Sequence, residues 1–184
     1  MRPIFFNVEE LETVDLAVLR AEELVNNYFK LSPTFWLKNR YDIKTAVGLS
    51  PQECIGGVFA QVLKYEGRRG GGSLGSSSFS LYNICLQDPA VLGVVSENQG
   101  IRLAPFLLYV LIHELVHVVR FSRFEHRYEN GSEADVTFEE EKKVHGLTYK
   151  IVAPSNVSGL AGIIDFFKEW QGVLPGSDRS KVFG

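Results

Sequence analysis

Cysteine is scarce in this chain, and there is no excess of basic charge. The two cysteines, Cys54 and Cys85, match no metal-binding spacing, and neither lies near a histidine in the sequence. We therefore expect reduced thiols rather than disulfides or a cysteine–metal site. The formal net charge of −3 gives no reason to expect nucleic acid or an anionic membrane as a partner.

Targeting and phosphate-binding signals are also missing. The N-terminal residues turn acidic after a short apolar run, which does not fit a signal peptide, so we expect a cytoplasmic protein. The longest apolar run is too short to span a bilayer and leads straight into charged residues. The glycine-rich stretch 66–78 lacks the Gly-Lys-Ser/Thr ending of a phosphate-binding loop. It predicts a flexible connection or, alternatively, a flap over a cleft.

The bulk composition is that of an ordinary globular domain. The chain has 184 residues, of which 45% are apolar and 22% charged, and this length is sufficient for a sizeable core. No repeat or composition shift divides it. We predict a single domain over residues 1–184, with a loose tail from about residue 174. The expected fold class is α+β, a helix-rich domain with a small, mostly antiparallel sheet packed on the helix that contains residues 105–121.

Hydrophobic periodicity and capping residues predict the individual elements. Apolar residues at three-to-four spacing indicate helices, whereas alternating apolar residues indicate strands. On the first helix, Leu16 and Leu19 fall outside the inner stripe, which indicates a possible second contact surface. The expected elements are a helix at 11–29, a helix opened by a capping box at 50–53, strands at 58–65 and 79–86, and helices at 87–95, 105–124, 137–151 and 158–170.

The helix expected from Pro105 onward contains the sequence His113-Glu114-Leu115-Val116-His117. Its two histidines are spaced i and i+4, so they project from one face about 6 Å apart and can converge on one ion. Glu114 is rotated by about 100° from His113, which places its carboxylate beside such an ion. The alternative is a pair of core histidines hydrogen-bonded to the backbone.

This H-E-x-x-H pattern resembles the signature of the zincin metallopeptidase superfamily. The resemblance covers five residues of the chain. It implies a Zn²⁺ ion held by His113 and His117, with Glu114 activating a zinc-bound water for attack on a peptide carbonyl. It would also place a strand such as 79–86 along the upper edge of a substrate cleft, where a peptide could add to it by backbone pairing.

A catalytic zinc site needs a third protein ligand. One zincin branch takes a histidine six residues after the second, following a glycine, but Arg123 and Arg120 stand at those positions here. The gluzincin branch takes a glutamate from a second helix. We assign that role to Glu141, because it shares the inward stripe of the helix expected at 137–151.

Other residues remain open for roles around the metal. Glu139 points outward, and Glu140 is expected in a capping box with Thr137; His126 is the main rival as third ligand. His145 stands one turn after Glu141, where the gluzincin pattern has an acidic group. It is predicted as a second-shell partner, with a fourth ligand or an oxyanion donor as alternatives.

Arg120 shares a face with His113 and His117. It could therefore pair with a carboxylate of the site, although a surface arginine at the helix end is the expected role.

The predicted function is therefore a zinc-dependent metallopeptidase acting on a peptide or a small protein. The alternatives are a non-catalytic metal- or partner-binding protein on a zincin fold, and a zinc hydrolase of a non-peptide amide. A closed fourth ligand from His145 or His126 would distinguish the non-catalytic protein from the enzyme.

Overall fold

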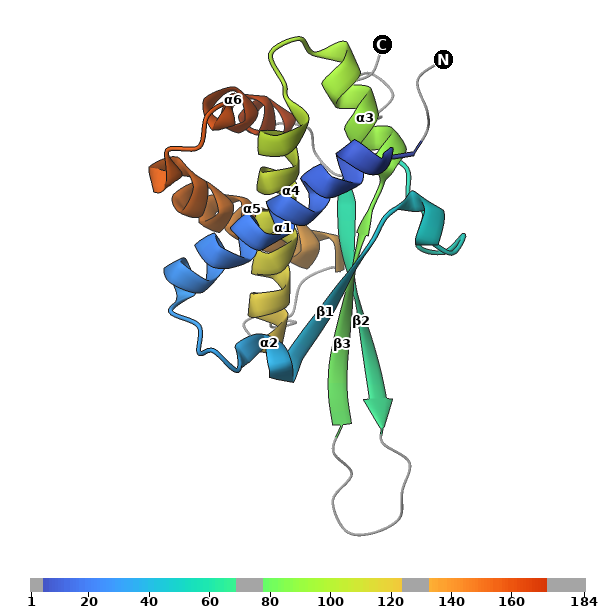
Figure 1. Cartoon of the computed structure of the whole chain (residues 1–184). Coiled ribbons are helices and arrows are strands. Elements are labelled where there is room, and N and C mark those ends of the chain that lie inside the picture. The colour runs from blue at the N-terminus through green and yellow to red at the C-terminus, as the bar shows by residue number, and fades with distance from the viewer. Residues whose placement is uncertain (1–4, 69–77, 124–132, 172–184) are drawn as a thin grey trace.

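Helices surround one long central helix in the computed structural model, which describes residues 5–68, 78–123 and 133–171 (Figure 1). The helix-rich α+β fold predicted from the sequence is confirmed. The elements are α1 (Val8–Phe29), α2 (Phe35–Lys38), β1 (Asn39–Lys44), the 3₁₀ turn η1 (Ala46–Gly48), β2 (Ala60–Arg68), β3 (Ser78–Leu86), α3 (Asp88–Glu97), α4 (Leu103–Ser122), α5 (Glu133–Val152), the 3₁₀ turn η2 (Ala153–Ser155) and α6 (Leu160–Gln171).

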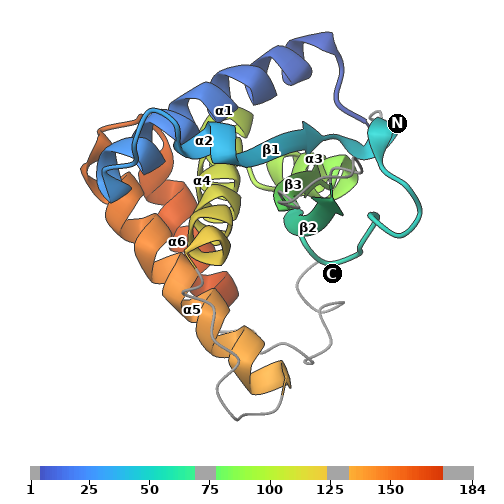
Figure 2. The same cartoon turned by 90° about the horizontal axis from the view of Figure 1, so that it is seen from below.

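The central helix is α4, and it is buried on all sides. Every residue from Pro105 to Arg120 is buried. A helix that is apolar around its whole circumference needs neighbours on every side. Figure 2 shows α1 on one side of α4, α5 and α6 on the other, and the sheet alongside. By length and composition α4 could cross a membrane, but 89% of its most apolar window is buried inside the protein, as in the core helix of a soluble protein.

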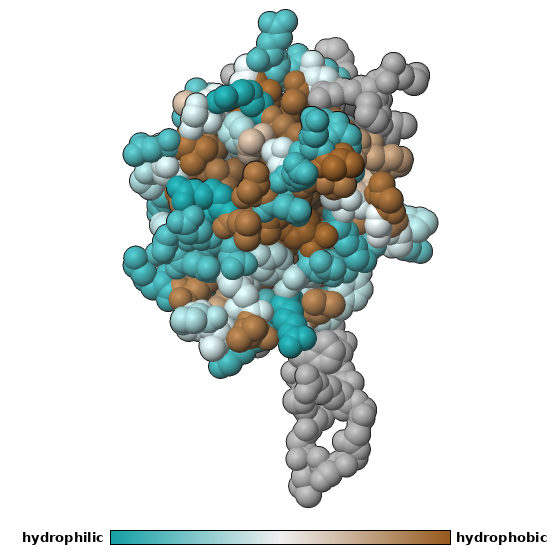
Figure 3. All heavy atoms as spheres, viewed as in Figure 1, coloured by the Kyte–Doolittle hydropathy of each residue, from teal (hydrophilic) through white to brown (hydrophobic). Residues whose placement is uncertain are grey.

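The first helix packs on α4 through the predicted stripe. Val14, Ala17, Ala21 and Val25 are buried, and the capping box that opens α1 is formed by Asn7 and Glu10. The helix therefore begins three residues earlier than predicted. On its outer side Leu16 and Leu19 are exposed, and Figure 3 shows apolar atoms gathered on this face of the molecule.

The sheet has three strands in the order β1-β3-β2, and its pairing is mixed. β2 runs antiparallel to β3, with Ala60 opposite Leu86, whereas β1 runs parallel to β3, with Asn39 opposite Ser80. The expectation that 79–86 forms the edge of a cleft is wrong, because β3 is the central strand. The segment 34–45, which carried no clear periodicity, supplies β1 and occupies the other side of β3.

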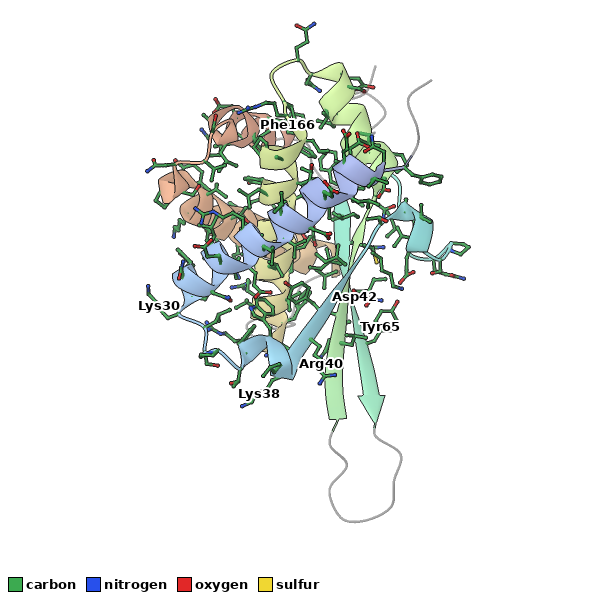
Figure 4. The ribbon with its side chains drawn as sticks, viewed as in Figure 1. Lys30, Lys38, Arg40, Asp42, Tyr65 and Phe166 are labelled. Carbon is green, nitrogen blue, oxygen red and sulfur yellow. The ribbon has the colours of Figure 1, made fainter. Side chains whose placement is uncertain are left out.

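Polar residues at the end of α2 and along β1 face outward. Lys38, Arg40 and Asp42 are exposed, and Figure 4 shows them on the outside of the molecule. Near the N-terminal end of α4, aromatic rings of α4, of α6 and of the residue before β2 form a cluster. Phe59, Phe106, Phe166 and Phe167 lie with centroids 5.0–6.3 Å apart, which joins α6 and the residue before β2 to α4.

The helix predicted to start at Ser50 is absent. Ser50 and Glu53 do bond each other, because the Ser50 amide donates to the Glu53 carboxylate at 2.8 Å and the Glu53 amide donates to the Ser50 carbonyl at 2.9 Å. These bonds close a turn instead of opening a helix. Gly57, with a φ of 77°, then turns the chain toward β2, and Lys44 of β1 donates to the Glu53 carboxylate at 2.9 Å.

Glu53 contributes stability that acid removes. The Ser50 amide and then the Lys44 ammonium group lower the pKa of Glu53 from 4.5 to about 2. Because the folded-state pKa is the lower one, this stabilisation is complete above the unfolded pKa and is lost as the pH falls toward the folded one. We expect the difference in thermal midpoint between wild type and Glu53→Gln to shrink as the pH falls from about 6 to about 3.

Thermal unfolding of both proteins across this pH range tests the prediction. Glu12→Gln, at an exposed position of α1, is the control, and its small effect on the midpoint should not change with pH in the same way. A difference for Glu53→Gln that stays constant down to about pH 3 would contradict this role of Glu53.

Candidate metal centre

Two histidines of α4 project together toward α5. His113 and His117 are 9% and 7% exposed, and their ring centroids lie 4.8 Å apart. Since no glycine or proline interrupts α4 after Pro105, the i, i+4 spacing gives the shared face that the sequence predicted. The alternative of two core histidines bonded to the backbone is wrong, because their Nε2 atoms face each other and a carboxylate.

That carboxylate belongs to Glu141 of α5. Its Oε2 atom lies 3.2 Å from His113 Nε2, and its Oε1 atom lies 3.1 Å from His117 Nε2. The two Nε2 atoms are 3.2 Å from each other. These three residues form a group whose possible ligand atoms all lie within 4.8 Å of one another. Antiparallel packing of α4 and α5 thus brings together the three residues predicted as ligands, although the structure does not identify an ion.

The donor set fits zinc. Zinc bonds histidine nitrogen and carboxylate oxygen at about 2.0–2.2 Å with tetrahedral angles, so ligand atoms of one ion are about 3.3–3.5 Å apart. The separations of 3.1–3.2 Å come close to this spacing. Two imidazoles and one carboxylate are also a ligand set that catalytic zinc sites use. His113, His117 and Glu141 can therefore hold Zn²⁺ after a shift of a few tenths of an ångström.

The second ring nitrogens of both histidines are not hydrogen-bonded. His113 Nδ1 and His117 Nδ1 are buried and have no partner among the residues that the structure describes. Metal-binding histidines usually donate this N–H to a carboxylate, a carbonyl or water. Here the rings are held by neighbouring rings, since His117 stacks on Phe121 at 5.6 Å and His113 lies 4.4 Å from His145. Packing of the helices therefore orients the two imidazoles.

Charges within the His–His–Glu group shift the pKa values of Glu141 and His117. Burial by itself would raise the pKa of Glu141, but contacts with His113 and His117 outweigh it and lower that pKa. Burial would likewise lower the pKa of His117, but Glu141 and Glu114 outweigh it and raise that pKa. Without a metal, the cluster thus favours an ionised Glu141 carboxylate, which is the form that a metal requires, and a protonated His117, whose proton a metal has to displace.

Glu114 lies beside the group and outside it. Its side chain is only 6% exposed, and burial raises its pKa, while the nearby His113 and His117 oppose that rise. A carboxylate whose pKa is raised by burial is a better proton acceptor than one in water. The placement of the Glu114 carboxylate beside a bound ion stays a prediction; the structure shows that Glu114 is buried and interacts electrostatically with His113, His117 and Glu141.

His145 is a neighbour of the cluster and not a member of it. The group of mutually close ligand atoms leaves it out, and its Nδ1 atom lies 3.3 Å from the Tyr109 hydroxyl. Burial, followed by the charge of His113, lowers the pKa of His145 to about 3, so the ring is neutral. A pocket of about 210 Å³ begins at this pair, lined by Tyr109, His145, Gly146, Tyr149, Ile164 and Lys168.

Arg120 and Glu140 have roles that differ from those expected. Arg120 was predicted at the surface and Glu140 in a capping box, but α5 already begins at Glu133, so Glu140 is inside the helix. Both residues are buried, and they form a two-point ion pair with N–O distances of 2.6 and 2.9 Å. The sequence feature that indicated this ion pair is the position of Arg120 three residues after His117, which places Arg120 on the face of α4 toward α5.

One residue near the site was not predicted, and one predicted candidate lies outside the described residues. Tyr109 was not predicted near the site, although its position four residues before His113 on the same helix face could have indicated it. His126, the rival third ligand, lies outside the described residues, as does most of the glycine-rich stretch.

The comparisons with known proteins give no relatives. No family model, curated protein or solved structure matches this chain. The described residues define a helix-rich α+β protein in which two buried histidines and the half-exposed Glu141 form a group that could hold a metal ion.

Proposed function

We propose that this protein is a zinc-dependent hydrolase and, more specifically, a metallopeptidase of the zincin type with a gluzincin-like ligand set. The observation that carries the proposal is the convergence of His113 Nε2, His117 Nε2 and the Glu141 carboxylate at 3.1–3.2 Å. Glu114 follows His113 in the sequence, is buried, and interacts electrostatically with both histidines. When bound, zinc supplies a Lewis acid that lowers the pKa of water toward about 7 and polarises a carbonyl.

The chain's own residues supply the proton transfers. Glu114 accepts a proton from the attacking water and then donates it to the leaving amine. Its burial supports this role, because a desolvated carboxylate binds the proton more strongly than an exposed one does. His145 lies outside the ligand group, so among the described residues His113, His117 and Glu141 would hold the ion, and three protein ligands would leave room for a water as in catalytic zinc sites.

A peptide or a small protein is the proposed substrate, and the pocket at Tyr109 and His145, which none of the three candidate ligands lines, is the proposed place for one of its side chains. The pocket volume of about 210 Å³ is smaller than the roughly 300–1,000 Å³ typical of pockets that enclose a whole small molecule. A space of this size suits one side chain of a longer substrate. The aromatic rings of Tyr109 and Tyr149 in its lining favour an apolar side chain.

A cytoplasmic location is part of the proposal. Cys54 is exposed, Cys85 is buried, and both are free. Free thiols of this kind suit a reducing compartment.

Removal and return of the metal tests the proposed function. We expect the zinc-loaded protein to cleave members of a peptide library, to lose this activity after treatment with a chelator, and to regain it when zinc is restored. The same treatment should lower the thermal midpoint, because a ligand that binds only the folded state stabilises it. Cleavage that is equally fast after complete removal of zinc would contradict a metallopeptidase.

A further inference from the structure

A buried ion pair lies next to the carboxylate that completes the metal cluster. Arg120 of α4 donates through Nε to Glu140 Oε1 at 2.6 Å and through Nη2 to Glu140 Oε2 at 2.9 Å. Arg120 is 8% exposed and Glu140 is 7% exposed. The pair joins the two helices that supply all three candidate ligands, because Arg120 follows His117 by three residues and Glu140 directly precedes Glu141.

Stability alone does not account for such a pair. Two charges lose their hydration when they are buried, and their attraction often does no more than offset that loss. Apolar residues of similar volume stabilise a protein as well or better. A two-point contact between a guanidinium group and a carboxylate does, however, specify distance and orientation, which an apolar contact does not.

The metal centre needs contacts that fix the distance and orientation of its ligands. In most metal sites, hydrogen bonds to the second histidine nitrogen orient the ligands, but His113 Nδ1 and His117 Nδ1 lack such bonds among the described residues. The position of Glu141 relative to the two histidines therefore depends on how α5 packs against α4. Two buried polar contacts between these helices lie on either side of the cluster, Tyr109–His145 and Arg120–Glu140, and the second is ionic and two-point.

We propose that Arg120 and Glu140 are positioning residues of the metal centre. Their ion pair sets the register of α5 on α4 so that Glu141 faces His113 and His117, and it raises the affinity for zinc without touching the ion. This inference rests on the metal centre of the proposed function. It assigns the pair to ligand geometry rather than to the stability of the fold.

The test separates these two roles with an apolar replacement of the whole pair. The double variant Arg120→Met with Glu140→Leu removes both charges of the pair together, so that neither is left buried without the other. We expect the metal-free variant to keep the circular dichroism and thermal midpoint of the metal-free wild type. Its zinc affinity, measured by competition with a chelator, should fall by about 10–100-fold. The visible absorption spectrum of the Co²⁺-loaded variant should also change, since that spectrum reports ligand geometry.

A second variant tests the inference if the double variant does not fold. Arg120→Lys keeps the charge but replaces the two-point contact with a single ammonium contact. We expect it to fold and to bind zinc about tenfold more weakly than wild type. A folded variant of either kind with the zinc affinity and Co²⁺ spectrum of wild type would overturn the inference.

A matched control is the exposed pair Arg20–Glu23 on α1, whose side chains are 43% and 56% exposed. Arg20→Gln with Glu23→Gln should leave zinc affinity unchanged, because among the described residues no hydrogen bond or ion pair joins Arg20 or Glu23 to α5 or to the ligands. A loss of affinity as large as that of the buried pair would show a nonspecific effect and would also overturn the inference. If the wild type binds no zinc, the proposed function fails with it, whereas a zinc-binding wild type with unaffected variants refutes the positioning role alone.

Discussion

Glu114→Gln is expected to keep zinc and to lose hydrolysis. The amide has nearly the shape of the carboxylate but cannot accept the proton of the attacking water. Loss of a general base typically lowers kcat by about 10²–10⁴-fold, which corresponds to about 3–5 kcal/mol in the activation barrier. Steady-state cleavage of the best peptide substrate, with zinc content measured on the same sample, tests this expectation.

The control for this variant is Glu139→Gln, which makes the same chemical change at an exposed position near the site. It should retain both zinc and turnover. Full turnover in Glu114→Gln, with contaminating peptidases excluded, would remove Glu114 from the mechanism. Loss of zinc together with turnover would instead mean that Glu114 supports the metal directly.

Glu141→Ala is expected to abolish stable zinc binding and, with it, hydrolysis. Residues that only support metal ligands contribute about 10–100-fold to affinity, so the loss of a direct ligand should cost about 100-fold or more. Both carboxylate oxygens of Glu141 lie 3.1–3.2 Å from the histidine nitrogens, so its truncation leaves two ligands instead of three. Competition with a chromophoric chelator measures the change in affinity.

Glu139→Ala provides the comparison on the same helix. Glu139 is two residues away and exposed, so its truncation should leave zinc affinity as in wild type. Equal zinc affinity in Glu141→Ala and wild type would contradict the assignment of the third ligand. The search for that ligand would then turn to His126.

The main features of the metal centre follow from local sequence rules. The uninterrupted apolar run after Pro105 predicted α4, and the i, i+4 spacing predicted that His113 and His117 share a face. Glu141 was predicted because it lies on the same stripe as Val144 and Thr148, both of which are buried. Periodicity thus indicated which side of α5 faces α4, without any long-range information.

The features that were missed depend on pairing between distant segments. The stretch 34–45 has no clear period; its first half forms α2, and Asn39–Lys44 forms β1 because β3 offers it a free edge. Ser50 and Glu53 form one of the two bonds of the expected capping box, from the Ser50 amide to the Glu53 carboxylate, but the Glu53 amide bonds the Ser50 carbonyl, and the segment is a turn.

The partner of Arg120 was missed for a related reason. Pairing of Arg120 with a carboxylate of the site was only the alternative to a surface position, and Glu140 was expected in a capping box, because charged residues of this type are usually solvated.

The central claim is that His113, His117 and Glu141 hold one zinc ion. The most direct test is elemental analysis of the purified wild-type protein after incubation with zinc and removal of the excess, beside His117→Ala treated in the same way. The account predicts one zinc per wild-type chain and none retained by the variant. A wild type that retains no metal, or a His117→Ala variant that retains as much zinc as wild type, would contradict it.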